Sequence, residues 1–560
     1  MKRSGLIYIF LAVCMAGLML SCAPVDEPSE NDGPVAEIPA DPETQPDEDP
    51  EQPGTEQDPG QDPDPEPTPD LPSFESSYEA IRSMGVGWNL GNTLDAVWWT
   101  GGTDGRDWRA WETGWGQPVT KPELMTMMKN AGFGAIRVPV TWGVHMDADG
   151  RVFDEWMNRV NEIVDYVLNA GMYCIINIHH DTGADSDAWL VADPEIYQTV
   201  KARYEGLWKQ IAERFKSYDQ RLLFESYNEM LDESRSWCYA SMNLGYDATA
   251  AAQAYDAINS YAQSFVDVVR ATGGNNAVRN LVVNTYGACN GSGTWNQHLP
   301  DPLIYMKRPV DTVEDHILFQ VHAYPLIDDL PSMEAEVSEM FRLLDQHLAS
   351  QGGPVIIGEW GTFSENPSLE NFCYYADYFV RTAKEYGMGT FHWMNLSDGF
   401  YRSIPAFSHP EITEAIVKAY HGEGFTPQIP LLEDYDLDYK VTYRQLWSEA
   451  NLHPSTLYLS EYKGLTFELA EAPESGTLQV KVYGESDGKE QYTPFEGASA
   501  NVYFDKSILG TKVIRTTLQC MIDKQIEVQI KSVSLIKSDG TLEPAMPSVF
   551  WGCDIELLVN

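Results

Sequence analysis

Residues 135–181 read AIRVPVTWGVHMDADGRVFDEWMNRVNEIVDYVLNAGMYCIINIHHD and contain one complete strand–helix–strand unit. The short β-branched apolar runs at 135–140 and 173–180 predict two strands. Between them, residues 155–170 repeat apolar side chains every three or four positions, which predicts a helix, and Gly171 just beyond is typical of a helix end. Continuous apolar strands joined through a helix predict a parallel sheet with helices on its faces.

The same unit recurs along the chain. Similar runs predict six further strands at 86–90, 222–229, 281–286, 317–324, 354–360 and 390–395. Helical patterns separate these runs, for example at 121–131, 195–216 and 254–271. Eight strands, each followed by a helix, predict closure into a (β/α)8 TIM barrel over residues 73–424.

Reactive side chains lie at the C-terminal ends of the predicted strands, where functional residues of this fold gather. Burying an unpaired charge is costly, so each such residue is either ion-paired for structure or part of a site. For any one residue both interpretations stay open, and the agreement of six strand ends favours a site. The residues are Arg137, His179, His180, Asp181, Asn228, Glu229, His322, Tyr324, Glu359, Trp360, His392 and Trp393.

Two glutamates on different strands of one barrel suggest glycoside hydrolysis, which needs a proton donor and a second carboxylate. Asn228 precedes Glu229, and its amide can bind a sugar hydroxyl. We expect Arg137 and Tyr324 to hold Glu359 ionised. We expect His322 to keep Glu229 protonated or to restore its proton. The two glutamate roles need pKa values that differ.

Seven motifs occur in an order that resembles glycoside hydrolase family 5, over about residues 75–422. The branch with secreted endo-β-1,4-glucanases and xyloglucanases is especially similar. The resemblance implies that Glu229 is the acid/base and Glu359 the nucleophile of a retaining enzyme without a cofactor or metal. The motifs are GWNLGNTLDA (87–96), IRVPVTW (136–142), INIHHD (176–181), ESYNEM (225–230), VHAYPL (321–326), IGEWGT (357–362) and FHWMN (391–395).

The resemblance also implies substrate contacts and a substrate class. The expected substrate is a β-1,4-glucan backbone in cellulose-type, mixed-linkage or xyloglucan form, with xylan or mannan as alternatives. A non-catalytic glycan-binding lipoprotein is the alternative class, and the intact glutamate pair favours the enzyme. The implied binding residues are Arg137, His179, Asn228, His322, Tyr324 and Trp393.

Two further features surround the predicted site. His179, His180 and Asp181 resemble metal ligands, but adjacent side chains on a strand point to opposite faces, so we expect no metal there. Tryptophans crowd the predicted loops after the strands, which favours an open cleft that grips a polymer internally, although some of them will only anchor loops. They are Trp98, Trp99, Trp108, Trp111, Trp115, Trp189, Trp237 and Trp295.

The N-terminus predicts export. Lys2 and Arg3 precede an apolar run that ends in LMLSC at 18–22, which resembles a bacterial lipobox and implies a lipid on Cys22. Ala23 lacks the aspartate associated with inner-membrane retention, so the expectation is an outer-membrane lipoprotein exposed at the cell surface. An ordinary secretory signal, giving a secreted protein, is the alternative.

Residues 23–72 contain 14 prolines, 17 acidic residues and no basic ones. Such a segment cannot bury a core and predicts a disordered tether that reaches at most ~150 Å. The whole chain carries a net charge of −47, which disfavours nucleic acid and suits a neutral polysaccharide. We expect a monomer that contacts the membrane only through its lipid.

Beyond residue 425 the hydrophobic period becomes two, ending in a long alternating run over 549–559. Residues 425–560 therefore predict an antiparallel β-sandwich of the jelly-roll type, which is either a carbohydrate-binding module or a packing domain. Trp447, Tyr492 and Phe495 are its candidate sugar platforms.

Without CxxC spacing the cysteines predict no zinc site, and the pairs available for disulfides are Cys238 with Cys289 and Cys520 with Cys553.

Overall fold

The computed structural model describes residues 73–97, 104–185, 187–364, 367–393, 399–403, 406–431, 437–453 and 456–559. The predicted signal segment, Cys22, the tether, Trp98 and Trp99 lie outside these ranges. Among the described residues, no helix has the length and apolar character needed to cross a bilayer.

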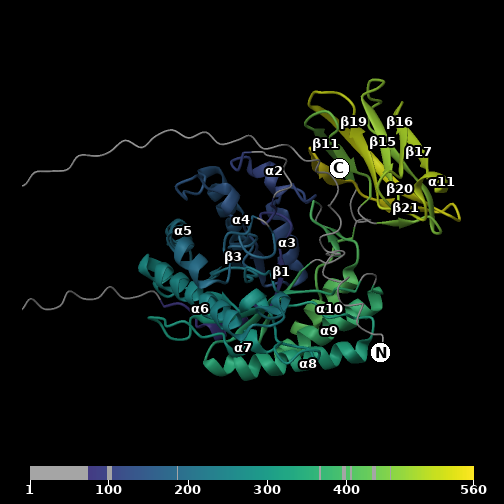
Figure 1. Ribbon diagram of the computed structural model, residues 1–560. Coiled ribbons are helices and arrows are strands. Elements are labelled where there is room, and N and C mark those ends of the chain that lie inside the picture. The colour runs from purple at the N-terminus through teal and green to yellow at the C-terminus, as the bar shows by residue number, and fades with distance from the viewer. Residues whose placement is uncertain are drawn as a thin grey trace, which may run out of the picture. The chain divides into compact units, whose positions relative to one another are not determined.

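Eight parallel strands close into a barrel in which β8 pairs with β1, and helices surround it (Figure 1). This confirms the predicted (β/α)8 fold. The strands are β1 (Val86–Asn89), β2 (Ala135–Val138), β3 (Tyr173–Asn177), β4 (Leu222–Glu225), β5 (Leu281–Asn284), β6 (Ile317–Ala323), β7 (Val355–Trp360) and β8 (Gly389–His392).

Several helices begin and end at residues that are typical of helix caps. Asp193 accepts hydrogen bonds from the first backbone N–H groups of α5, and Gly132 ends α3 in the left-handed conformation at φ 114°. The helices are α1 (Ser77–Met84), α2 (Trp108–Glu112), α3 (Pro122–Ala131), α4 (Asp154–Asn169), α5 (Pro194–Arg214), α6 (Ala248–Ala271), α7 (Asp301–Ile304), α8 (Leu330–His347), α9 (Leu369–Glu385) and α10 (Pro410–His421).

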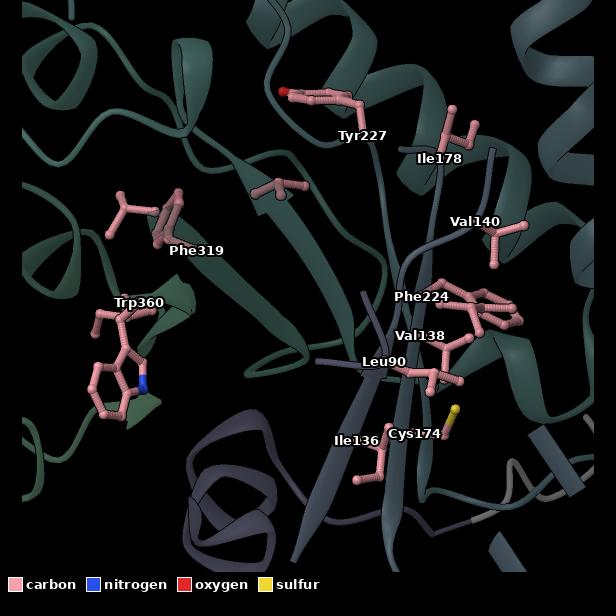
Figure 2. Packing of buried hydrophobic residues seen from close by; sticks show 14 of the residues in the cluster. Leu90, Ile136, Val138, Val140, Cys174, Ile178, Phe224, Tyr227, Phe319 and Trp360 are labelled. Atoms are coloured by element: carbon pink, nitrogen blue, oxygen red, sulfur yellow. The ribbon is translucent and has the colours of Figure 1, made fainter. Parts of the chain in front are cut away.

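Alternation along the strands separates two apolar clusters. One face of the strands packs with the helices, as Ile136, Val138 and Phe224 do in Figure 2. The other face forms a cluster that includes Ala135, Ile175, Leu223, Val282 and Leu318, and α1 contributes Ile81 and Met84 to it. The next inward positions, two residues further along five of these strands, are polar and buried: Arg137, Asn177, Glu225, Asn284 and Gln320. The barrel interior thus changes from apolar to polar toward the C-terminal strand ends.

The strands end one to four residues earlier than predicted at β1 to β6, and β8 ends at His392 instead of 395. The reason is that, at these positions, backbone groups hydrogen-bond to polar side chains and no longer to the neighbouring strand of the sheet. The backbone N–H of Val140, for example, donates to Asn177 Oδ1 at 3.0 Å instead of to a neighbouring strand. Most of the predicted site residues therefore stand in loops just beyond the strands.

Two antiparallel sheets share one core at the C-terminus, which confirms the predicted β-sandwich. The orders β17-β14-β20-β11-β23 and β16-β15-β19-β12-β22, with chain-adjacent strands mostly in opposite sheets, have jelly-roll connectivity. The strands are β11 (Leu437–Tyr443), β12 (Glu449–Asn451), β14 (Tyr462–Leu469), β15 (Leu478–Tyr483), β16 (Glu490–Pro494), β17 (Ser499–Tyr503), β19 (Arg515–Cys520), β20 (Ile526–Lys537), β21 (Leu542–Ala545), β22 (Ser548–Trp551) and β23 (Cys553–Val559), with β13 (Leu457–Tyr458), β18 (Lys512–Val513) and α11 (Lys506–Leu509) beside them.

Two expectations for this region are wrong, and so is one for the cysteines of the barrel and the sandwich together. The final run is not one strand, because Gly552 at φ 61° divides it into β22 and β23 in different sheets. Phe495 is 2% exposed and packs on Phe467 in the core, so it is no sugar platform. The six cysteines of the described residues are all free, so neither proposed pair forms a disulfide. Cys553 instead contacts the carbonyl oxygen of Glu449, with its Sγ at 3.1 Å.

Candidate active site

Arg137 organises the polar layer of the barrel. Its side chain is fully buried, and its five N–H groups make five hydrogen bonds. Two of them reach the Glu225 carboxylate at 2.7 and 2.8 Å, and one reaches Glu359 Oε1 at 2.7 Å. The other two reach the side-chain oxygens of Asn89 and Asn228, at 3.0 and 2.8 Å. A fully bonded guanidinium holds two carboxylates and two amides in fixed positions.

Glu359 is contacted by three groups: Arg137 on β2, and His322 and Tyr324 at the end of β6. Besides Arg137, the Tyr324 hydroxyl donates to its Oε2 at 2.8 Å, and His322 Nδ1 lies 3.4 Å from the same oxygen. The Glu359 side chain is 6% exposed. The expected contacts of Glu359 with Arg137 and Tyr324 are thus present, and both favour its ionised form.

Glu229 stands in a different environment. Its Oε1 lies 2.7 Å from His322 Nδ1, and its side chain is 23% exposed, so it faces the open end of the site. The bonds of Arg137 go to other groups. One carboxylate oxygen of Glu229, one of Glu359 and a ring nitrogen of His322 all lie within 4.8 Å of one another.

These environments act differently on the pKa values of the two carboxyl groups. Burial raises the pKa of Glu229 to about 7, and the nearby charge of Glu225 adds to this, against Arg137. Burial also raises the pKa of Glu359, but His322, Arg137 and the Tyr324 hydrogen bond oppose that rise. Arg137 neutralises only one of the charges on Glu225 and Glu359. A third charge on Glu229 would stand unpaired, which favours a protonated Glu229 beside an ionised Glu359.

The remaining implied binding residues border the same space. Burial lowers the pKa of His322 to about 4 and that of His179 well below its usual range, so both rings are neutral near pH 7. Asn228 Nδ2 lies 3.4 Å from His179 Nε2. The Trp393 ring lies parallel to His179, with the ring centres 5.8 Å apart. Gly91 is required here, because a Cβ on it would lie 2.4 Å from the Trp393 ring.

The sequence model of the family described as Cellulase (glycosyl hydrolase family 5) matches residues 99–399, which is more than half of the chain. The chain belongs to glycoside hydrolase family 5. This fits a closed barrel with paired glutamates at its C-terminal end.

Solved structures in family 5 resemble the barrel part of the chain. A GH5-4 broad specificity endoglucanase from an uncultured bacterium is 52% identical with a TM-score of 0.59, and the match covers 63% of this chain and 98% of that one. A family 5 enzyme of Prevotella bryantii B14, solved as a mutant with a xyloglucan tetradecasaccharide, is 41% identical with a TM-score of 0.56. That match covers 62% of this chain and 99% of the other.

Curated relatives are more distant. Endoglucanase A of Clostridium longisporum is 33% identical over 337 residues, which cover 58% of this chain and 60% of that protein. Endoglucanase B of Neocallimastix patriciarum is also 33% identical, over 334 residues that cover 57% of this chain and 65% of that protein. The family 5 chain therefore spans less than two thirds of the length of these relatives.

Sequence reasoning missed the inner support of this family 5 site. Glu225 pairs with Arg137, while Asn177 and Asn284 donate to Glu225 Oε1 at 3.0 and 3.2 Å. Asn284 also donates to the backbone oxygen of Asn228 at 3.0 Å. The available signal was the spacing, because each of these residues lies two positions beyond an apolar inward residue on its strand. These residues hold the groups that face the substrate space.

The expectation that His179 and His180 point to opposite faces is wrong. Their ring centres lie 4.5 Å apart, because β3 ends at Asn177 and strand alternation no longer applies. One ring nitrogen of each and a carboxylate oxygen of Asp95 lie within 4.8 Å of one another. That carboxylate accepts the backbone N–H groups of Asn92 and Thr93, which gives it a structural role in a turn.

Some of the described tryptophans are buried and anchor loops, and others have exposed rings. Trp111 is 6% exposed, and Trp189 donates to Asp181 Oδ1 at 2.6 Å, so both anchor loops. Trp115 lies edge-on to His180, with the ring centres 5.3 Å apart, and thereby borders the site. Trp295 is 57% exposed. The set therefore supports the expected aromatic cleft only in part.

Glu225→Gln is expected to shift the pH dependence of this enzyme. If Glu229 is the general acid of a hydrolysis, it must be protonated, so kcat/KM should fall about tenfold per pH unit above its pKa of about 7. The Glu225 charge helps to raise that pKa, so its removal should move the alkaline limb to lower pH. Glu339→Gln, on the surface of α8, should leave the limb in place. A limb that stays or moves upward in Glu225→Gln would contradict the electrostatic account.

Proposed function

We propose that this family 5 chain is a retaining endo-β-1,4-glucanase that uses Glu359 as nucleophile and Glu229 as acid/base. The observation that carries the proposal is that one carboxylate oxygen of Glu229 and one of Glu359 lie within 4.8 Å of each other, with Arg137 and Tyr324 bonded to Glu359 and not to Glu229. Retaining enzymes hold their carboxyl groups about 5–5.5 Å apart, whereas inverting enzymes need about 6.5–9.5 Å to admit a water. The short separation supports direct attack by a carboxylate.

In the first step, the Glu359 carboxylate attacks the anomeric carbon and forms a covalent glycosyl–enzyme. The glycosidic C–O bond breaks, and Glu229 gives its proton to the leaving oxygen. Arg137 and Tyr324 hold Glu359 through its two oxygens, which fixes the direction of attack. Glu229 leaves this step ionised, in contact with His322.

In the second step, the ionised Glu229 takes a proton from water, and the resulting hydroxide attacks the anomeric carbon. The bond to Glu359 breaks, so both carboxyl groups return to their starting states. Neutral His322 lies 2.7 Å from Glu229 and 3.4 Å from Glu359, where it can share the proton that the two steps move. Asn228 Nδ2 is placed to donate to a sugar 2-hydroxyl, because Arg137 already occupies its oxygen.

The β-glucan substrate is proposed from the relatives. The curated relatives are named endoglucanases, and one solved relative holds a xyloglucan oligosaccharide. Trp393 and Trp115 offer flat apolar rings beside the site, which suits pyranose faces. The paired carboxylates favour this enzyme over a non-catalytic glycan-binding protein.

The test is a polysaccharide panel of cellulose-type glucan, mixed-linkage glucan, xyloglucan, xylan and mannan. New reducing ends should form on at least one β-1,4-glucan, and the viscosity of the soluble polymer should fall early, as internal cleavage requires. Activity confined to xylan or mannan would overturn the substrate assignment. No cleavage of any polymer by the folded protein would instead support the glycan-binding alternative.

We also propose that Cys22 carries a lipid that anchors the enzyme to the outer membrane, with secretion as the alternative. The support is the lipobox-like LMLSC sequence followed by the acidic, proline-rich segment. Cys22→Ala is expected to move the protein from the membrane to the soluble fraction while its specific activity on soluble glucan stays the same. A variant that stays with membranes washed in high salt would exclude the lipid as the anchor.

A further inference from the structure

A row of side chains crosses the outer face of the five-stranded sheet of the C-terminal sandwich. Tyr492 on β16 stands opposite Lys481 on β15, and Gln519 on β19, Glu449 on β12 and Trp551 on β22 are paired in register. The two groups are offset by two residues, because Lys481 stands opposite Thr517 and Gln519 opposite Gln479. Four strand spacings of ~4.8 Å separate the two ends, so the row is ~19 Å long. The same residues and Trp447 line a hollow of about 410 Å³, within the range of ligand sites.

Three aromatic rings that line this hollow face solvent. Trp447 is 50% exposed, Tyr492 51% and Trp551 39%. Trp447 also has a φ of 69°, an uncommon conformation for a bulky residue, and its backbone N–H donates to the Cys520 carbonyl at 2.9 Å. Such a conformation persists only where the surrounding structure holds it. Trp447 is therefore fixed in place while its ring stays accessible.

A bonded polar group lies between the rings. Glu449 is only 5% exposed, and its carboxylate accepts the hydroxyls of Thr517 and Tyr483, both at 2.7 Å, and the amide of Gln519. Lys481 pairs with Glu490 at 3.1 Å, and its Nζ lies 5.5 Å from the centre of the Tyr492 ring. These bonds set the positions of amide and ammonium groups on an otherwise aromatic surface, as recognition of a polar ligand with flat faces requires.

We propose that this face is a second, non-catalytic site that binds a β-glucan chain along the row from Tyr492 to Trp551. The exposed rings stack on the pyranose faces, and Lys481 and Gln519 donate to sugar hydroxyls. A neutral chain fits because the protein carries a net charge of −47, which opposes polyanions. That the ligand is the polymer cut in the barrel rests on the proposed function. Binding here would raise the local concentration of substrate for the barrel.

The experiment uses the full chain with Glu359→Gln, so that the ligand is not consumed, and cellohexaose titrated in a calorimeter. The parent should bind two molecules, one in the barrel and one on the sandwich. Trp447→Ala with Trp551→Ala should bind one, and each single change should weaken the second site about tenfold, the scale of one aromatic contact. Tyr503→Ala, on β17 and 59% exposed, is the matched control and should still bind two.

Two other results would contradict the proposed glucan site. A double variant that binds as many molecules as its parent overturns the second site. If the double variant changes only the sedimentation of the protein, the face is an interface between copies and the glucan proposal fails. Hydrolysis by the unmodified chain is measured separately on soluble glucan. If the unmodified chain does not hydrolyse glucan, the number of molecules bound can still depend on Trp447 and Trp551. The two proposals therefore fail in different measurements.

Discussion

Glu359→Gln is expected to lower kcat/KM on a soluble β-1,4-glucan by on the order of 10⁴-fold or more. The amide keeps the shape of the side chain but cannot form the covalent intermediate. Arg137 keeps its bidentate partner Glu225 in this variant, so the barrel should stay folded. Initial rates of reducing-end formation measure the effect, and the melting temperature checks the fold.

Glu339→Gln is the control for this substitution. It removes a carboxylate from the surface of α8, where it pairs with Arg342, and should leave the rate unchanged. A Glu359→Gln enzyme that retains more than a few per cent of the wild-type rate on unactivated polymer would show that Glu359 is not the nucleophile.

Glu229→Gln is expected to lower the rate on polymer by about 10²–10⁴-fold, the usual contribution of a general acid. With a dinitrophenyl cellobioside, the rate of the first step should fall much less, because the dinitrophenolate leaving group departs without a proton. Its second step still needs a base to activate water. Added azide should therefore speed turnover and yield a glycosyl azide, since an anion attacks without deprotonation.

The contrast between substrates tests the role of Glu229 more closely than the loss itself. Equal losses on polymer and dinitrophenyl glycoside, with no response to azide, would mean that Glu229 acts only through structure. If azide instead restores turnover of Glu359→Gln and not of Glu229→Gln, with a glycosyl azide of retained configuration, the two assignments are reversed.

Closure of the barrel explains why the outer part of the site was predictable. Arg137, Glu229, His322, Tyr324 and Glu359 stand up to 222 residues apart, and closure of the barrel brings all five to one end. The Glu359 contacts with Arg137 and Tyr324, and the contact of His322 with Glu229, follow from this topology. These contacts could be predicted because polar residues at the ends of apolar runs are easy to recognise in the sequence.

The inner support was not predictable in the same way. Glu225 stands four residues before Glu229 on one predicted strand, and the sequence does not state where that strand ends or which face turns inward. The error on His179 and His180 has the same origin, because the alternation rule was applied beyond the end of β3. In the sandwich, Phe495 and Tyr492 were equal candidates by sequence, and only packing separates the buried ring from the exposed one.

Trapping of the glycosyl–enzyme tests the central claim most directly. The enzyme would be incubated with dinitrophenyl 2-deoxy-2-fluoro-β-cellobioside, whose fluorine slows both steps while its leaving group permits the first. Peptide mass spectrometry then locates the sugar. The account predicts one fluorocellobiosyl group on Glu359 and none in Glu359→Gln. A label on Glu229, Glu225 or another side chain, or an active enzyme that never takes up the label, would contradict it.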